Sequence, residues 1–198
     1  MRVKEITVYP FSELANDVKS KVLDSFRDIS TDTEWYECVM DEWTERLEEY
    51  GFVKPKIYFS GFGSQGDGAC FDAGIDVGAI EGKFALSLPE RLIFPFSRHR
   101  HAFETFLSES EFRIITTNFR YSHENCRSID YSTARSHGKY FLPYLEAFAE
   151  WLEAERKKLC RQIYRALEKE FDYLTSDEAV KETIEANDYE FTTTGKVA

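Results

Sequence analysis

The chain has 198 residues, of which 42% are hydrophobic and 16% aromatic, and its formal net charge is −11. This apolar content is enough for a packed domain and excludes wholesale disorder. A surplus of carboxylates repels a phosphate backbone, so general nucleic-acid binding is not expected. The ordinary role of such charge is a solvated surface, and the alternatives are recognition of a basic protein partner or imitation of nucleic-acid charge.

The first 50 residues predict a strand followed by two amphipathic helices. Residues 2–9 alternate between the two sides of a strand, which Pro10 ends, and Ser12 is placed to cap the next helix. Gly51 stands where the C-terminal cap of the second helix belongs. Apolar residues recur at helical spacing: Leu14, Val18, Val22, Leu23 and Phe26 in the first helix, and Trp35, Val39, Trp43 and Leu47 in the second.

A glycine-rich stretch joins the next two predicted strands. The flanking sequences KIYFSGF and ACFDAGIDV have strand character, and GSQGDG lies between them. Gly63, Gly66 and Gly68 reach positive φ without steric cost, so a β-hairpin with a glycine-rich tip is predicted. The string matches neither GxxxxGK[ST] nor a GxGxxG that opens a helix, so no phosphate-binding loop of those types is predicted.

The role of this hairpin tip stays open between a structural turn, which we favour, and contact with a ligand or partner. Asp67 would repel an anion unless its carboxylate bonds the amides of its own loop, which is the ordinary role of Asp in turns. Ser60, Ser64 and Gln65 offer uncharged hydrogen-bond partners. These four residues are the first candidate contact residues.

A dense basic patch, SRHRHAF, follows in this acidic chain and supplies Arg98, His99, Arg100 and His101. With Arg120 and other basic residues of the next strands, they would line a pocket for phosphate or a nucleotide. The alternative, which we favour, is surface ion pairing with the abundant carboxylates. Those other basic residues are Arg113, His123, Arg127 and Arg135.

Signatures of catalysis and of metal binding are not recognised. His99 or His101 as a general base lacks an identifiable nucleophile, and there is no HExxH or GxSxG. Cys126 with His123 lacks a second ligand pair for zinc. We therefore expect a protein that is not an enzyme, with no catalytic residues, no metal and no cofactor.

The cysteines and the chain opening favour a cytoplasmic protein. The four cysteines include no CxxC pair, and the opening MRVKEITVYPF carries charges that a secretory signal lacks in its apolar region. No uncharged apolar stretch approaches the ~20 residues that cross a bilayer, so no membrane association is expected. We expect reduced and mostly buried thiols: Cys38, Cys70, Cys126 and Cys160.

The remaining sequence predicts further helices and a strand pair. Residues 79–110 suit one or two short helices interrupted by Pro89 and Pro95, and EFRIITTNFRYS with CRSIDYST suits two strands. From Lys139 the apolar spacing predicts a helix of about 30 residues, roughly 45 Å long. Because this apolar stripe is longer than one sheet can cover, we expect a homodimer through the helix. A short helix capped by Thr175 and a strand within YEFTTT complete the tail.

Together these elements predict a single α+β domain over residues 1–198. An antiparallel sheet of about five strands would be packed by the two N-terminal helices and the long C-terminal helix. Residues 1–138 would form the sheet-containing core, and residues 139–198 the long helix with its small helix–strand tail.

Three segments resemble small uncharacterised accessory proteins of tailed bacteriophages and prophages, some of them labelled antitoxin-like. The segments are EITVYPFSELANDVKSKVLDSFRD, YFSGFGSQGDGACF and YLTSDEAVKETIEANDYEFTTTGK, with SGFxSQGDGA as the marker of the group. The resemblance implies a phage protein made in the cytoplasm of a bacterial host. Such genes often encode inhibitors of host defence, including restriction, CRISPR and nucleotide-signalling systems.

Three functions stay open from the sequence. The leading hypothesis is a non-enzymatic acidic protein that binds and inhibits a host defence or regulatory protein, in the manner of an anti-CRISPR or anti-restriction protein. An antitoxin-like binder is a variant of it. The second is a nucleotide-messenger sponge that uses the arginine and histidine cluster, and the third is a hydrolase or transferase using Asp67, His99 or His101.

Overall fold

The computed structural model describes residues 5–84, 89–133 and 139–198. The chain forms two compact units, a terminal unit (residues 1–37 and 167–198) and a central unit (residues 38–166). The chain passes between them after residue 37 and again within the long helix α6 (Leu142–Leu174). Neither passage coincides with the division at residue 138 that the sequence suggests, and cooperative folding as one domain stays a prediction.

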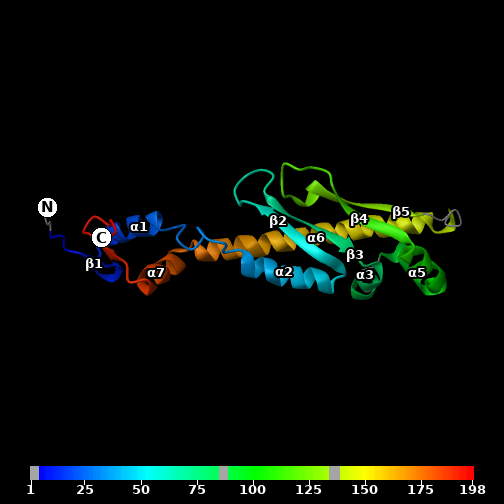
Figure 1. Cartoon of the computed structure of the whole chain (residues 1–198), viewed down its shortest axis with the longest axis horizontal. Coiled ribbons are helices and arrows are strands. Elements are labelled where there is room, and N and C mark those ends of the chain that lie inside the picture. The colour runs from blue at the N-terminus through cyan, green and yellow to red at the C-terminus, as the bar shows by residue number, and fades with distance from the viewer. Residues whose placement is uncertain (1–4, 85–88, 134–138) are drawn as a thin grey trace. The chain divides into compact units, whose positions relative to one another are not determined.

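The terminal unit joins the two ends of the chain around an apolar cluster. A 3-10 turn (Phe11–Glu13) and α1 (Asn16–Ser25) come from the N-terminal end, and α7 (Asp177–Ala186) comes from the other (Figure 1). β1 (Tyr9–Pro10) pairs antiparallel with β6 (Glu190–Phe191). The cluster confirms the apolar stripe predicted for the first helix, and its buried members are Phe11, Leu14, Val18, Val22, Val180, Ile184 and Phe191.

Three local predictions for the terminal unit are wrong. Residues 5–8 form no strand, since pairing is limited to Tyr9 and Pro10, and residues 2–4 lie outside the described range. Ala15, not Ser12, stands at the N-cap of α1. Ser176, one residue beyond the predicted Thr175, caps α7 by accepting a hydrogen bond from the Ala179 N–H at 3.2 Å.

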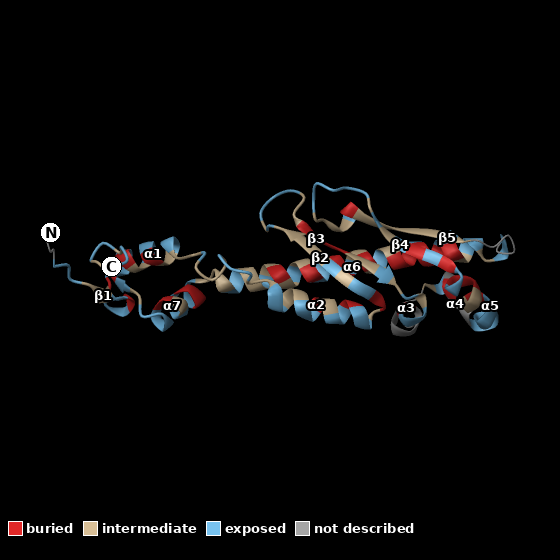
Figure 2. Ribbon diagram, in the orientation of Figure 1, coloured by how far each residue is buried: buried red, intermediate tan, exposed pale blue. Residues whose placement is uncertain are grey.

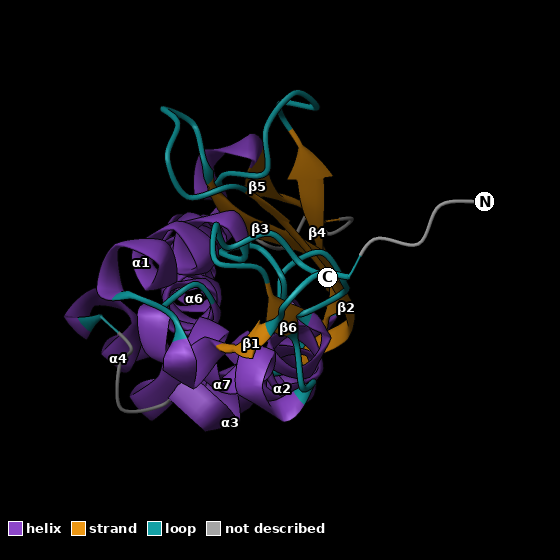
Figure 3. Cartoon of the chain, turned by 90° about the vertical axis from the view of Figure 1, so that its left-hand side faces the viewer, coloured by secondary structure: helices purple, strands orange, loops and turns teal. Residues whose placement is uncertain are grey.

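The central unit places two antiparallel hairpins against helices. β2 (Phe52–Ser60) pairs with β3 (Gly68–Ile75), and β4 (Ser110–Thr116) pairs with β5 (Arg127–Thr133). β3 lies next to β4, but no ladder joins the two hairpins within the described residues. The strands gather on one side of this unit, with α2 (Glu37–Glu49) and α6 on the other (Figure 3).

The α+β class is therefore confirmed, whereas the single sheet of about five strands is wrong. The described strands form separate two-stranded ladders, and one of these belongs to the terminal unit. Helix α1 also belongs to the terminal unit, so of the two predicted N-terminal helices only α2 packs in the central unit. The alternating pattern of a strand shows which residues lie on each face but not which strand is its neighbour. Periodicity alone therefore overestimates the number of strands in one sheet.

Aromatic and aliphatic side chains fill the core of the central unit. Phe112 of β4 meets Phe148 of α6 with ring centroids 5.4 Å apart, and Phe52 meets Phe71 across the first hairpin at 4.9 Å. Trp43 of α2 is buried, as the helical spacing predicts. Gly51 closes α2 with a φ of +91°, which confirms the predicted cap.

Helix α6 buries its apolar stripe within this chain (Figure 2). The sequence predicts a homodimer because it expects part of this stripe to be uncovered. Since the stripe is buried, that reason no longer holds, and the homodimer stays a prediction. Over the described ranges, no helix combines the length and the apolar character needed to cross a membrane. The buried apolar residues of α6 are Leu145, Ala147, Phe148, Ala149, Trp151, Leu152, Leu159, Cys160, Ile163 and Leu167.

Short helices connect the two hairpins. These are α3 (Val77–Phe84), α4 (Glu90–Arg98) and α5 (Arg100–Ser108). The sequence predicts one or two short helices here, whereas the described residues form three. Pro89 stands at the N-cap of α4, but Pro95 lies inside this helix and does not interrupt it as predicted. Helix α5 buries its aromatic face and so completes the core beside α6.

Candidate functional site

The glycine-rich tip of the first hairpin, residues 61–67, is held together by Asp67. Asp67 Oδ2 accepts hydrogen bonds from the N–H groups of Gly63 at 2.9 Å and Ser64 at 2.7 Å. These two bonds lower the pKa of the Asp67 carboxyl below its ordinary value. Gly66 adopts a φ of +103°, which only glycine reaches without strain. The carboxylate thus occupies the amides of its own loop, as the turn interpretation predicts.

A second loop, residues 117–126, lies against this tip. A Cβ at Gly68 would stand 2.9 Å from a ring carbon of His123, and one at Gly66 would stand 3.4 Å from the ring of Tyr121. Glycine at these two positions lets the loops approach closely. Both loops project from the same end of the hairpins (Figures 1 and 3). Residues 61–67 and 117–126 are together named the loop pair.

Helix α6 anchors both members of the loop pair. The Tyr164 hydroxyl donates a hydrogen bond to the Gly61 carbonyl at 3.1 Å, and its ring lies 5.4 Å from that of Phe62. Arg161 Nη1 donates to Glu124 Oε1 at 2.8 Å. Since a helix is a rigid element, these contacts fix loop positions that backbone bonding alone would leave loose.

The fully buried side chain of Arg156 supports the second loop from beneath. Its Nε and Nη2 donate to the two carboxylate oxygens of Glu153 at 2.9 and 2.8 Å. Nη2 also donates to the carbonyls of Glu124 at 2.8 Å and Arg127 at 2.7 Å. Glu153 in turn accepts the N–H of Ile129 at 3.1 Å. The Arg156–Glu153 pair therefore joins α6 to the end of the loop and the start of β5.

Electrostatics keep this pair charged. Burial acts to lower the pKa of Arg156, but its hydrogen bonds to Glu153 outweigh that effect, and the pKa lies above its ordinary value. Burial likewise acts to raise the pKa of Glu153, and the bonds from Arg156 bring it below the ordinary value. Removing Glu153 would leave the fully buried Arg156 charge without its carboxylate, whereas Glu153 also lies 3.3 Å from Lys157 Nζ.

Arg156 also contacts a buried thiol. All four cysteines are free, and three of them are buried, as the sequence predicts. Arg156 Nη1 donates to Cys160 Sγ at 3.6 Å. Burial raises the pKa of Cys70 to about 11 and that of Cys160 to about 12, so both are neutral and poor nucleophiles at pH 7. In the described part of the chain, no group of three or more His, Cys, Asp or Glu residues is placed to hold a metal ion.

The outer surface of the loop pair carries exposed aromatic side chains beside one arginine. The Phe119 side chain is 91% exposed, and that of Tyr121 is 40% exposed. The Arg120 guanidinium lies 5.2 Å from the ring centroid of Tyr121, and the Arg120 backbone N–H donates to Asn118 Oδ1 at 2.8 Å. Large exposed apolar side chains beside an arginine are typical of recognition surfaces.

The nine predicted contact residues fall into two groups in different parts of the central unit. Ser64, Gln65, Asp67 and Arg120 lie in the loop pair, with Ser60 at the end of β2 beside it. The others lie around the junction of α4 and α5, apart from the loop pair (Figure 1). The structure therefore does not bring Arg120 together with them. These others are Arg98, His99, Arg100 and His101.

Three of the arginines proposed for a nucleotide pocket contact carboxylates. Arg100 Nε contacts Glu104 at 2.6 Å, and Arg127 Nε is bonded to Asp72. Arg113 Nη2 lies 3.8 Å from Asp130. These contacts agree with the ion-pairing alternative, while Arg135 lies outside the described residues. Nucleotide binding stays a prediction.

Sequence reasoning missed Arg156, Glu153 and Tyr164. The signal for Arg156 was its spacing, since it follows the buried Leu152 by four residues and precedes the buried Leu159 by three. An arginine inside an apolar stripe must find a carboxylate or carbonyl partner, and Glu153 stands one turn away. The sequence offers Phe119 and Tyr121 as aromatic residues beside Arg120 that could stack on a base, but it does not predict the exposure of Phe119, because that depends on how the second loop is held.

The central unit is an α+β fold in which two hairpins pack on a long helix. Its most distinctive surface is the loop pair, which carries exposed aromatic side chains. The chain belongs to the family described as a domain of unknown function, DUF8835, whose model matches residues 35–177. The match contains the whole central unit, so the loop pair and the Arg156–Glu153 pair lie inside it. No curated protein and no solved structure matches the chain.

Proposed function

We propose that this protein acts without catalysis, by binding another protein through the loop pair. The observation that carries the proposal is the exposed aromatic side chain of Phe119 beside Arg120 and Tyr121. Tyrosine and arginine are enriched among the residues that dominate binding energy, and aromatic residues as a class are enriched at interfaces. Burying Phe119 and Tyr121 under a partner would remove a large apolar area from water.

The anchoring of the loop pair supports the same proposal. Asp67 closes the first loop, and Tyr164, Arg161 and Arg156 fix the loops to α6. A surface that is already ordered loses less conformational entropy when it binds, so more of the contact energy appears as affinity.

The proposed target is a defence or regulatory protein of a bacterial host, blocked in the host cytoplasm. The resemblance of three segments to phage accessory proteins supports this setting. The net charge of −11 supports a partner with a basic surface, because complementary charge accelerates encounter and suppresses wrong partners. Inhibition of a restriction or CRISPR protein, and masking of a toxin, are variants of one mechanism and differ in the target.

Affinity capture with matched variants tests the proposal. Tagged wild type, a Phe119→Ala/Tyr121→Ala variant and a Tyr173→Ala control would be expressed during phage infection of a bacterial culture, and the captured proteins identified by mass spectrometry. Tyr173 is 57% exposed and lies outside the loop pair. We expect wild type and control to retain the same host protein. The double variant should lose it, because truncating interface anchors costs about 2 kcal/mol or more, roughly 30-fold in Kd.

Three results would contradict the proposal. The first is the absence of any specific host protein at both low and physiological salt. The second is equal capture by the double variant, which would move the binding surface elsewhere. The third is a substrate consumed with turnover by the purified protein, which would make it an enzyme.

A further inference from the structure

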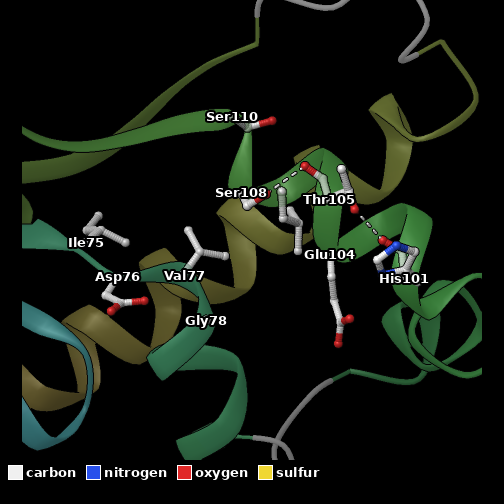
Figure 4. A pocket seen from close by; sticks show the side chains of 10 residues that line it. Ile75, Asp76, Val77, Gly78, His101, Glu104, Thr105, Ser108 and Ser110 are labelled. Atoms are coloured by element: carbon white, nitrogen blue, oxygen red, sulfur yellow. Dashed lines mark hydrogen bonds between the residues drawn. The ribbon is translucent and has the colours of Figure 1, made fainter.

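Two hollows in the central unit use no residue of the loop pair. The larger, of about 740 Å³, is bordered by the end of β3, the start of α3 and one face of α5 (Figure 4). Its charged side chains do not converge, since those of Asp76 and Glu104 lie on opposite sides of Val77 (Figure 4). The smaller, of about 330 Å³, is lined by residues of β5 and α6, and it lies beside backbone groups whose direction is defined.

Strand β5 has one edge that no other strand pairs. Over the described ranges, β5 forms a ladder with β4 alone. In an antiparallel ladder, residues that bond the partner strand alternate with residues whose backbone groups point the other way. The Thr117 N–H donates to the Cys126 carbonyl at 2.9 Å, which fixes the alternation for the pairs that follow. Residues 128, 130 and 132 therefore face β4, and residues 127, 129, 131 and 133 point outward.

Helix α6 confirms this direction and covers the first part of the edge. Arg156 Nη2 donates to the outward carbonyl of Arg127 at 2.7 Å. Glu153 Oε2 accepts a hydrogen bond from the outward N–H of Ile129 at 3.1 Å. Next along β5 come the Ile129 carbonyl and the N–H and carbonyl of Tyr131, named here the open edge. In the part of the chain that the structure describes, these three groups have no hydrogen-bond partner.

Unpaired backbone groups in a row are a template for a further strand, because each one costs free energy when it is covered without a partner. Extended segments of other proteins bind sheet edges in this way, with main-chain hydrogen bonds for affinity and side-chain pockets for specificity. The open edge supplies the main-chain groups, and the hollow beside it supplies such a pocket.

The hollow has an apolar part and an acidic part. Ile129, Tyr131 and Ala149 contribute apolar surface. Glu146 and Glu150 line it from α6, and both residues are exposed. They are four residues apart and so lie on one face of the helix. Burial, and after it the charges of these two carboxylates, raise the pKa of Tyr131, so both charges lie close to the open edge.

The charge of the hollow distinguishes two kinds of incoming strand. A second copy of this chain, paired edge to edge about a two-fold axis, would bring the Glu146 carboxylates of both copies to the same interface, and like charges across paired strands are destabilising. A segment with a lysine or arginine meets the opposite charge. Its long stem also covers apolar surface while the charged group reaches the carboxylate.

We propose that the open edge of β5 binds an extended segment of a partner protein, in which a lysine or arginine stands among β-branched or aromatic residues. The segment adds as a strand, accepting from the Tyr131 N–H and donating to the carbonyls of Ile129 and Tyr131. Its basic side chain pairs with Glu146. The inference goes beyond the proposed function, since it uses no residue of the loop pair.

Selection from a displayed library of random seven-residue peptides tests this inference. The full chain is immobilised as the Phe119→Ala/Tyr121→Ala variant, so that the exposed aromatic side chains of the loop pair do not select the peptides. We expect enrichment of peptides with lysine or arginine among β-branched or aromatic residues. The tightest peptide is then synthesised, and its affinity for the wild-type chain is measured by isothermal titration calorimetry.

Two changes test the strand geometry and the charge. N-methylation of the peptide amides, one at a time, should weaken binding about tenfold at alternate positions and little between them, because only alternate amides face β5. Glu146→Gln should weaken binding about threefold, the effect of an exposed ion pair. Glu45→Gln is the matched control, since it removes an exposed carboxylate of α2 outside the hollow and should leave the affinity unchanged.

Nuclear magnetic resonance locates the bound peptide. On peptide addition, the Tyr131 amide proton should shift and exchange more slowly. The Asp130 amide, which faces β4, should change little. Wild type and Phe119→Ala/Tyr121→Ala should bind the peptide equally, so this inference and the proposed function can fail independently.

Four results would overturn the inference. They are the absence of enriched peptides, enriched peptides without a basic residue, equal effects of N-methylation at every position, and an unchanged affinity of Glu146→Gln. A dimer in light scattering whose Tyr131 amide is already protected would also overturn it, because a second copy would then occupy the open edge.

Discussion

The terminal unit and the central unit are stabilised in different ways. In the terminal unit the buried residues are apolar, and Phe26 packs edge-on against Phe191 at 5.7 Å and Tyr189 at 5.2 Å. The central unit adds to its apolar core a buried ion pair that makes directional bonds to two backbone carbonyls. Apolar packing tolerates changes that conserve volume, whereas a buried charge must keep every partner. The proposed binding surface lies in the unit that has the less tolerant core.

The family match follows the same division. It spans residues 35–177 and leaves out residues 1–34 and 178–198, which supply most of the terminal unit. The central unit with its loop pair is therefore the part that defines the family.

The largest effect is expected from Arg156→Leu. The substitution removes the donor of the Glu124 and Arg127 carbonyls and leaves Glu153 with the Ile129 N–H and the Lys157 ammonium. Breaking a buried ion pair from one side costs about 3–5 kcal/mol. Hydrogen exchange read by mass spectrometry should show faster exchange in residues 127–133 of β5 than in α7, where protection should change little.

A double variant, Arg156→Leu/Glu153→Leu, is the control for this prediction. Replacing both partners by apolar residues of similar size removes the uncompensated charge, so the double variant should recover part of the lost stability. Equal loss of protection in both units with Arg156→Leu would mean that they unfold together, as a single domain would. If the double variant is as unstable as Arg156→Leu, the loss of stability does not come from an uncompensated charge of the Arg156–Glu153 pair.

The reverse experiment is Ile184→Ala in the terminal unit. Ile184 is fully buried in the apolar cluster, and truncation of such a side chain costs roughly 3 kcal/mol through lost burial and the cavity left behind. Exchange should accelerate in α7 and not in β5. The conservative Ile184→Val should cost about 1 kcal/mol, and a similar loss for both variants would contradict a tightly packed cluster.

The sequence predicts the elements of this fold better than their assembly. The stripe of α1, the cap at Gly51, the glycine-tipped hairpin and the long helix follow from local periodicity and turn chemistry. The single sheet and the placement of α1 do not, because a strand pattern does not specify its neighbour and a helical stripe does not specify which core it joins. Distant contacts such as that of α1 with α7 leave no local signal.

For the candidate site, the sequence identifies three residues of the first loop but only Arg120 of the second, and assigns Arg120 to a different cluster. Ser64, Gln65 and Asp67 follow from the glycine string, and the self-bonded carboxylate follows from turn chemistry. The second loop, which carries Phe119, is held by helix residues 32 and 37 positions from Glu124, and Tyr164 lies 103 positions from Gly61. For the basic cluster, the Arg100–Glu104 ion pair agrees with the ion-pairing alternative that the sequence favours in an acidic chain, and nucleotide binding stays a prediction.

A smaller effect is expected from Gly68→Ala at the contact between the two loops. The new Cβ would lie 2.9 Å from the His123 ring and 3.1 Å from its Cα, so the backbone of the second loop must shift. We expect a loss of about 1–2 kcal/mol in urea unfolding and faster exchange in residues 117–126. Gly63→Ala is the matched control, because a Cβ there meets nothing within 4 Å. Equal effects of the two variants would contradict close contact at Gly68.

The smallest effect concerns the pH dependence of the first loop. The folded state lowers the pKa of Asp67 from its usual 3.8, so its bonds to Gly63 and Ser64 are fully present above pH 3.8 and are lost as the pH falls through the lowered value. The amide proton shifts of Gly63 and Ser64, followed by ¹H–¹⁵N NMR, should titrate together with a midpoint below 3.8. Asp67→Asn should abolish this titration while the signals of β5 stay in place. A midpoint at or above the usual value would show that the carboxylate does not hold the loop. The loop pair would then be held in place by α6 alone, through Tyr164 and Arg161.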